Sequence, residues 1–424
     1  VTYLYGAEHA QIDPLHPTHA RYLVQGELAD MRGHPHPPLN AWVLGLLLAI
    51  FGDVRPVAFH IFYTLFSLIA ALAMWSLARR FCERPFVATL LFLVAPAFFV
   101  NGNSLESDLP FLACWMAAMA LFIRGVEIKS ALSLATAALA GALASLAAYQ
   151  AVLLTPILTA YLIGRKSTWR LAWAAIFAAP LTLGAWQLME RITSGVLPAA
   201  VLSGYLFTTY GLHTLRNTLH SGVALVVHSG WIVSPVLLIA AFAKAGKWRI
   251  MAAGIAALAG VFYDPNPLFW ASLGCGVLLL ASVLRRDFLS AWILIFFGAA
   301  LLIFFAGAAR YLLPIAAPVA ILVARAAGPR MLAAGVALQL PLSLGLTIAN
   351  YQHAEAYRNF AETLAPEAAG HRVWVNGEWG LRYYLESEGA LEPVRDQPVQ
   401  PGEMIVTSAL GQAVTFNAPL SPLL

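Results

Sequence analysis

Two carboxylates stand close together in a short polar stretch of the chain. Glu106 and Asp108 belong to the sequence Asn-Ser-Leu-Glu-Ser-Asp-Leu-Pro, which separates two apolar runs. Paired carboxylates can act as a general acid or base, or they can hold a metal ion. Asp108 would also suit the N-cap of a following helix, with Pro110 in its first turn. The motif therefore leaves two interpretations open, a catalytic carboxylate and a plain helix cap.

The segment before the first apolar run, residues 1–38, is rich in polar groups. It holds five of the eleven histidines, together with Asp13 and Arg21. Imidazole and carboxylate ligands suit zinc or manganese, but their spacing here matches no zinc motif, so no cofactor is certain and a divalent metal stays open. Asp13 is a candidate base, although its sequence Asp-Pro-Leu-His-Pro also suits a loop turn. Arg21 is a candidate substrate contact.

Three further residues could bind the substrate. His36 precedes two prolines at the start of the apolar run 39–51, where the N-terminus of an interfacial helix could hold a lipid phosphate. Arg310 ends an apolar run, and its forked guanidinium suits a phosphate or diphosphate, with Tyr311 beside it. Tyr149 lies where two apolar runs meet. The competing interpretations are a proline-initiated helix with a capping His and a snorkelling Arg with an interfacial Tyr.

The elements that must position these groups are membrane helices. Hydrophobic residues make up 60% of the chain and charged residues 11%, with mean hydropathy +0.74. A water-soluble core cannot hide this excess, so we expect an all-α polytopic membrane protein. About 20 apolar residues cross a bilayer. On this basis we expect twelve spans, near residues 55–78, 85–100, 109–123, 130–147, 150–164, 171–189, 221–243, 250–263, 267–284, 288–309, 311–324 and 331–349.

The basic residues predict the orientation. Alternate loops collect 15 of the 25 Lys and Arg residues, and by the positive-inside rule these loops are cytoplasmic. Three regions follow: a first extracytoplasmic loop with the interfacial helix (1–54), the helical domain (55–349) and a small extracytoplasmic α/β domain (350–424). In this last region the sequence predicts strands at 372–376 and 403–407 and a short helix at 380–386. An outside N-terminal segment needs a helix before it, so the intact protein would have thirteen spans.

Composition excludes other classes of partner and site. The basic residues are dispersed singly and in short clusters, which is unlike a nucleic-acid-binding surface, so no nucleic-acid partner is expected. Cys82, Cys114 and Cys275 are too far apart in sequence to indicate a disulfide framework or a zinc site. Membrane lipids are the expected surroundings.

Several of these motifs, taken in order, resemble those of family 39-type membrane glycosyltransferases. This GT-C family includes the bacterial aminoarabinose transferases and the protein O-mannosyltransferases. The resemblance covers nearly the whole chain. The residues that carry it are His36-Pro-Pro-Leu-Asn-Ala-Trp42, Ser76–Phe81, Ser107-Asp-Leu-Pro110, Arg310-Tyr-Leu-Leu-Pro314 and, in the C-terminal segment, Val373–Glu386.

The resemblance implies thirteen spans and a polyprenyl-phosphate sugar as donor. The acceptor would be a lipid, a glycan or a protein, and inverting transfer would occur on the outer face of the cytoplasmic membrane. A carboxylate would deprotonate the acceptor hydroxyl. The family's catalytic Asp lies in the first outer loop, which makes Asp13, Glu8 or an Asp before Val1 the candidate. The chain has His36 where many members carry Lys, and Tyr149-Gln where many carry Thr-Lys-Gly.

Three other functions remain as alternatives. A lipid flippase or transporter would place charges near mid-span and show repeat symmetry, whereas the polar residues here gather outside the spans. An O-antigen ligase or polymerase would be expected to carry its polar loop late in the chain. A non-catalytic envelope assembly protein would use residues 350–424 as a binding module.

Overall fold

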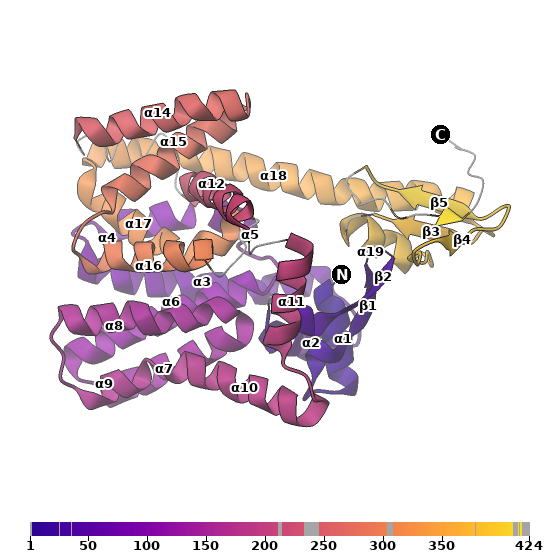
Figure 1. Ribbon diagram of the computed structural model, residues 1–424, viewed down its shortest axis with the longest axis horizontal. Helices are drawn as coiled ribbons and strands as arrows, with labels where there is room; N and C mark the ends of the chain where they lie inside the picture. The colour runs from indigo at the N-terminus through magenta and orange to yellow at the C-terminus, as the bar shows by residue number, and fades with distance from the viewer. Residues whose placement is uncertain are drawn as a thin grey trace. The chain divides into compact units, whose positions relative to one another are not determined.

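The chain is mostly helical and divides into two compact units (Figure 1). The computed structural model describes residues 2–24, 26–34, 36–210, 214–232, 246–302, 308–377, 379–409, 414 and 416–417. The large unit comprises Pro35–Asn40 and Val54–Leu346, and the small unit comprises Val1–His34, Ala41–Asp53 and Thr347–Leu424. Each unit is described by itself.

The large unit is built from helices, several of which begin at a proline whose missing N–H costs nothing in a first turn. Their order is α3 (Pro56–Phe81), α4 (Pro85–Leu93), α5 (Pro96–Asn101), α6 (Asp108–Ile128), α7 (Ala131–Ala147), η3 (Tyr149–Leu153), α8 (Leu154–Gly164), α9 (Arg170–Ala175), α10 (Ala178–Ser194), α11 (Pro198–Tyr210), α12 (Leu215–Ile232), α14 (Lys247–Tyr263), α15 (Pro267–Ser282), α16 (Phe288–Leu302), η5 (Ala309–Leu312), α17 (Leu313–Ala326) and the start of α18 (Pro329–Ala368).

The core of the large unit forms around α6 and α17. In each of these two helices 72% of the most apolar window is buried, and α6 packs against both α3 and α7. Trp115 and Trp292, from α6 and α16, are fully buried in this core. The corresponding windows of α3 and α10 are only 28% buried and therefore present apolar side chains outward. An outward apolar surface of this kind suits lipid.

Five helical segments of the described chain are long and apolar enough to cross a membrane. They are Pro56–Phe81, Asp108–Ile128, Arg170–Ser194, Ala309–Ala326 and Pro329–Ala368. Shorter apolar helices lie at Leu39–Phe51, Ala131–Ala147, Tyr149–Gly164, Pro267–Ser282 and Phe288–Leu302. These findings support a polytopic membrane protein, and the number of twelve or thirteen spans stays a prediction. Parts of the spans expected at 221–243 and 288–309 lie outside the described residues.

The spans expected at 85–100 and 331–349 differ from the helices of the structure. The span expected at 85–100 is broken at Val94 and Ala95, because Pro96 lacks the N–H that would continue α4 and starts α5 instead. The span expected at 331–349 belongs to a helix of 40 residues, α18, which continues to Ala368. Its second part is polar and carries the ion pairs of Arg358 with Glu355 and Glu362. Such pairs, three and four residues apart, support a helix exposed to water.

The small unit joins the two ends of the chain. Its elements are α1 (Thr2–Ile12), η1 (Pro17–His19), β1 (Arg21–Val24), β2 (Glu27–Asp30), η2 (Met31–Gly33), most of α2 (Leu39–Phe51), the end of α18, β3 (Val373–Asn376), α19 (Trp379–Ser387), β4 (Gln397–Pro398), β5 (Met404–Thr407) and β6 (Phe416–Asn417). β1 and β2 form an antiparallel hairpin, whereas β3 pairs in parallel with β5, and β4 with β6. The two strands and the short helix expected in the C-terminal segment are present.

One arginine ties the segments of the small unit together. Arg382 on α19 has a side chain only 5% exposed, and it pairs with Glu386 at 2.7 Å and with Glu392. It also donates to the Tyr5 hydroxyl of α1 at 2.9 Å and to the carbonyl of Leu23 in β1. A buried guanidinium with this many acceptors is well satisfied. It therefore holds the first 34 residues against the C-terminal segment.

Candidate functional site

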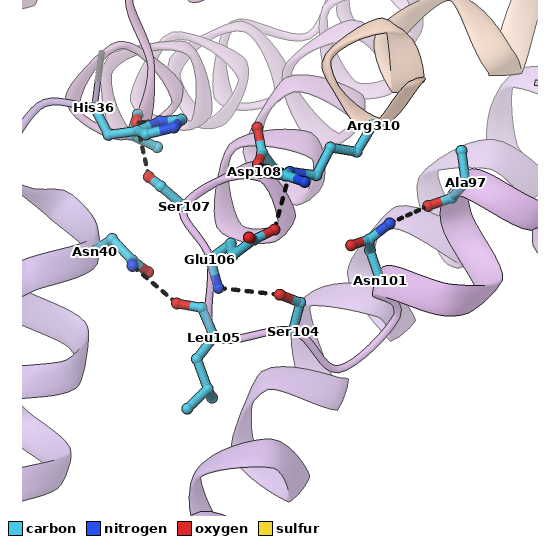
Figure 2. A network of polar contacts seen from close by, with 11 residues as sticks. His36, Asn40, Ala97, Asn101, Ser104, Leu105, Glu106, Ser107, Asp108 and Arg310 are labelled. Atoms are coloured by element: carbon cyan, nitrogen blue, oxygen red, sulfur yellow. Dashed lines mark hydrogen bonds and ion pairs between the residues drawn. The ribbon is translucent and has the colours of Figure 1, made fainter. Parts of the chain in front are cut away.

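Two carboxylates and one arginine meet in the large unit (Figure 2). The Nε of Arg310 lies 2.9 Å from Oδ2 of Asp108 and 3.0 Å from Oε2 of Glu106. The arginine comes from η5, and Asp108 precedes it by 202 residues. We refer to Glu106, Asp108 and Arg310 as the carboxylate–arginine cluster. It carries one net negative charge when both acids are ionised.

The two carboxylates differ in exposure. The side chain of Asp108 is 8% exposed, and that of Glu106 is 31% exposed. Burial raises the pKa of Glu106, the guanidinium of Arg310 opposes this rise, and the charge of Asp108 adds to it. Glu106 is therefore the acid of the cluster that a substrate can reach, and its raised pKa makes it a better proton acceptor than an ordinary glutamate.

Asp108 does not act as the helix cap that its sequence allowed. Ser107 occupies the N-cap of α6, no side chain caps the helix there, and Asp108 is the first helical residue. Its carboxylate reaches Arg310 instead. The interpretation of Asp108 as a plain helix cap is thus wrong, because its carboxylate accepts a hydrogen bond from Arg310 instead.

The loop before α6 is held from neighbouring helices, which fixes Glu106 in place. Asn40 donates from Nδ2 to the Leu105 carbonyl at 3.0 Å (Figure 2). The Tyr63 hydroxyl donates to Oδ1 of Asn40 at 2.6 Å. Both Asn40 and Tyr63 are buried. From α3, Ser67 also donates to the Gly102 carbonyl. The loop therefore has little freedom to move its carboxylates.

His36 contacts the last turn of α7. Its Nδ1 lies 3.2 Å from the Ala147 carbonyl, which also accepts from the Ser107 hydroxyl at 2.8 Å. Because a carbonyl oxygen only accepts, Nδ1 carries the hydrogen in this contact. Burial lowers the pKa of His36 to about 4, with the carbonyl opposing and Arg310 adding to the shift. At neutral pH His36 is uncharged, so it cannot supply a positive charge to a phosphate, and its binding role stays a prediction.

Two tyrosines complete the surroundings. The guanidinium carbon of Arg310 lies 5.0 Å from the ring centre of Tyr311, within cation–π range. Tyr149 starts η3, two residues after Ala147, and its hydroxyl accepts from Nε2 of Gln187 at 3.0 Å. The large unit thus contains Glu106, Asp108, Arg310, Tyr311, His36 and Tyr149. Arg310 contacts the first two of these and the ring of Tyr311.

Asp13 and Arg21 belong to the small unit. Asp13 accepts from the backbone N–H groups of Leu15 and His16 and pairs with the His16 ring at 2.9 Å. The hydrogen bond from His16 holds the pKa of Asp13 below its usual value. This geometry is the loop turn that its sequence suggested, and a lowered pKa suits a general base poorly. Arg21 is an exposed residue of β1. Their roles in a site stay predictions.

No metal ligand set emerges from the part of the chain that the structure describes. Among those residues, no group of three or more His, Cys, Asp or Glu side chains is gathered closely enough to hold an ion. The carboxylate–arginine cluster has only two such ligands, and both contact a guanidinium.

One protein-family model matches part of the chain. Residues 35–184 match the family model described as dolichyl-phosphate-mannose-protein mannosyltransferase. This match supports a GT-C glycosyltransferase-like protein. The match confirms the resemblance inferred from the motifs, and the family implies a membrane glycosyltransferase that uses a lipid-linked sugar. No curated protein and no solved structure matches the chain.

The matched segment covers less than half of the chain but includes much of this site. Glu106, Asp108, Asn40 and the contact of His36 with α7 lie inside it, whereas Arg310 lies outside it. Sequence reasoning assigned no role to Asn40 or Ser107, because neither carries a charge. The only available signal was their place inside the motifs that carried the resemblance.

Proposed function

We propose that this protein transfers a sugar from a polyprenyl-phosphate donor to an acceptor hydroxyl, with inversion, on the outer face of the cytoplasmic membrane. The observation that carries the proposal is the meeting of Arg310 with Glu106 and Asp108, two carboxylates of the matched family segment. Arg310 lies 202 residues after Asp108 in the sequence, yet it contacts both acids at the end of a membrane helix. Charged groups are costly to place in such surroundings and commonly mark functional sites in membrane proteins.

In the proposed reaction Glu106 is the base. The acceptor oxygen forms a bond to the anomeric carbon while the bond from that carbon to the donor phosphate breaks. The hydroxyl proton passes to Glu106, and the leaving phosphate takes the electron pair. A raised pKa favours this proton transfer near neutral pH.

Asp108 and Arg310 position the base. Asp108 is nearly buried and holds the guanidinium, and the guanidinium in turn contacts Glu106. Arg310 makes its closest contacts with both carboxylates through Nε–H, which is one of the five N–H groups on its side chain. We assign the remaining edge of Arg310, beside Tyr311, to the donor phosphate. Charge stabilisation of a leaving group in a water-poor site is commonly a large part of catalysis.

Turnover of lipid-linked sugars tests the proposal. The full chain in lipid nanodiscs is given a panel of radiolabelled polyprenyl-phosphate sugars, and release or transfer of label is followed. We expect turnover by the wild type and a loss of about 10²-fold or more with Glu106→Gln. Glu388→Gln is the matched control, because Glu388 is an exposed residue of the small unit.

Two results would contradict the proposal. One is full activity in both Glu106→Gln and Asp108→Asn. The other is saturable binding of a polyprenyl lipid with no turnover of any donor, which would favour a flippase or an assembly protein.

A further inference from the structure

A basic hollow lies at the end of α6 opposite the carboxylate–arginine cluster. Its volume is about 810 Å³, and its lining residues belong to the end of α6, the start of α9 and the loops that follow α6 and α8. Asp108 and Ile128 stand at the two ends of α6, and 21 helical residues rise about 30 Å. That length equals the hydrocarbon thickness of a bilayer. The residues of the hollow that carry the argument are Glu127, Lys129, Arg165, Lys166, Trp169 and Arg170.

The charges of the hollow are not balanced. Glu127, its one acid, pairs with both Arg80 and Arg165 at 2.9 Å. Lys129, Lys166 and Arg170 have no acidic partner among the described residues. Three cations thus line one cavity with no ion pair to an acid of the described part of the chain, and the attraction between them and an anion is the physical reason to expect a ligand.

The turns of the chain hold these cations in place. Lys129 follows the last turn of α6 in the left-handed region, with φ 50°, and Lys166 follows α8 with the same φ. The backbone N–H of Trp169 donates to the Ser167 hydroxyl, and the Trp173 ring N–H donates to the Ser167 carbonyl. In the loop after α6, the Ser130 hydroxyl accepts from the backbone N–H of Ser133. Hydrogen bonds therefore support both loops that line the hollow.

Exposed apolar residues neighbour the lining residues of the hollow in the sequence. Ile128 is 59% exposed and lies between Glu127 and Lys129, and Ile163 is 64% exposed and lies two residues before Arg165. Leu132 and Leu171 are also exposed apolar residues of these segments. A ligand with a negative head and a hydrocarbon tail suits basic and exposed apolar residues in the same segments better than a fully soluble anion does.

We propose that this basic hollow binds the phosphate group of an anionic phospholipid, in the leaflet opposite the carboxylate–arginine cluster. Lys129, Lys166 and Arg170 contact the phosphate, and the acyl chains lie against Ile128 and Ile163. This inference concerns a second site and does not depend on the proposed transfer reaction, since its readout is lipid binding.

Lipid retention by the purified full chain tests this site. Nanodiscs of phosphatidylcholine doped with phosphatidylglycerol are made, and the lipids that stay bound after extraction are measured by native mass spectrometry. We compare the wild type with the triple variant Lys129→Gln, Lys166→Gln, Arg170→Gln. The matched control removes three exposed charges elsewhere, in Lys247→Gln, Arg285→Gln, Arg286→Gln. We expect the first triple variant to bind phosphatidylglycerol at least about tenfold more weakly, and the control to bind it as the wild type does.

A second arm distinguishes the source of the phosphate. Glycerol 3-phosphate and inorganic phosphate are added as competitors in the same measurement. Retained lipid that neither anion displaces supports a phospholipid site, whereas displacement by either anion at low concentration overturns the lipid assignment in favour of a soluble phosphate ligand. Equal loss of lipid in both triple variants overturns the proposal, because binding would then follow total charge.

Discussion

At the scale of residues, the site consists of two carboxylates that share one guanidinium. Arg310 contacts Glu106 and Asp108 through the same nitrogen, so a change in any one of the three alters the other two. Sequence alone singled out all three side chains. Their contact could not be predicted, because nothing in the sequence tells which of the chain's many helix ends lie together.

The acid limb of the pH–rate profile tests this arrangement. A base must be ionised, so activity falls as pH drops through the pKa of Glu106, which burial places above the usual glutamate value. Asp108→Asn removes a charge that raises this pKa, so we expect the limb to move to lower pH. Arg310→Gln removes a charge that lowers it, so we expect the limb to move to higher pH. The measurement is kcat against pH in nanodiscs.

The opposite directions of these shifts are the decisive feature. If both variants moved the limb the same way, Glu106 would not be the titrating base. Glu388→Gln, which changes an exposed carboxylate of the small unit, should leave the limb in place.

At the scale of elements, the loop between α5 and α6 can position its carboxylates because side chains of α2 and α3 hydrogen-bond to its backbone. Asn40 sits between this loop and α3, accepting from Tyr63 and donating to the Leu105 carbonyl. An uncharged amide gives no sequence signal of such a role. Proline lacks the N–H that continues a helix, so the break before Pro96 is predictable from this residue. Hydropathy alone gives one continuous apolar run over 85–100, because it does not depend on backbone hydrogen bonds.

Loss of the Asn40 amide should weaken activity more than it weakens the fold. In Asn40→Ala the buried Tyr63 hydroxyl and the half-buried Leu105 carbonyl each lose a hydrogen-bond partner, which costs about 1–3 kcal/mol in stability. We expect kcat to fall about tenfold or more, because Glu106 is no longer held within reach of the acceptor. The check is kcat together with thermal unfolding in detergent.

Tyr63→Phe is the graded comparison for that variant. It removes only the hydroxyl that donates to Asn40 and leaves the Leu105 contact intact. We expect a smaller loss of kcat than in Asn40→Ala. An equal or larger loss would show that Tyr63 acts by a route other than the loop.

At the scale of the whole molecule, the chain separates a bilayer-sized helical unit from a small α/β unit made of both chain ends. Hydropathy predicted the class of the large unit, and strand patterns predicted β3, α19 and β5. The union of residues 1–34 with the C-terminal segment was not predicted, because it depends on Arg382, a charged residue that sequence reasoning would place at the surface.

Arg382 should be critical for the stability of the small unit. Arg382→Gln leaves Glu386 and the nearly buried Glu392 without their cation, and breaking a buried ion pair typically costs about 3–5 kcal/mol. We expect faster hydrogen exchange in β1 and β3, measured by mass spectrometry. Arg395→Gln, which breaks an exposed pair with Glu27, should change exchange little. Unchanged exchange in Arg382→Gln would contradict the role of this residue.

The shared nitrogen of Arg310 has a consequence for the timing of charge in the proposed reaction. While Glu106 is ionised, its attraction to Arg310 competes with that of Asp108. When Glu106 takes up the acceptor proton, it becomes neutral and its hold on the guanidinium weakens. The positive field of Arg310 then grows at the moment when the departing phosphate gains its negative charge. One proton transfer would thus both activate the nucleophile and strengthen the electrostatic attraction for the leaving group.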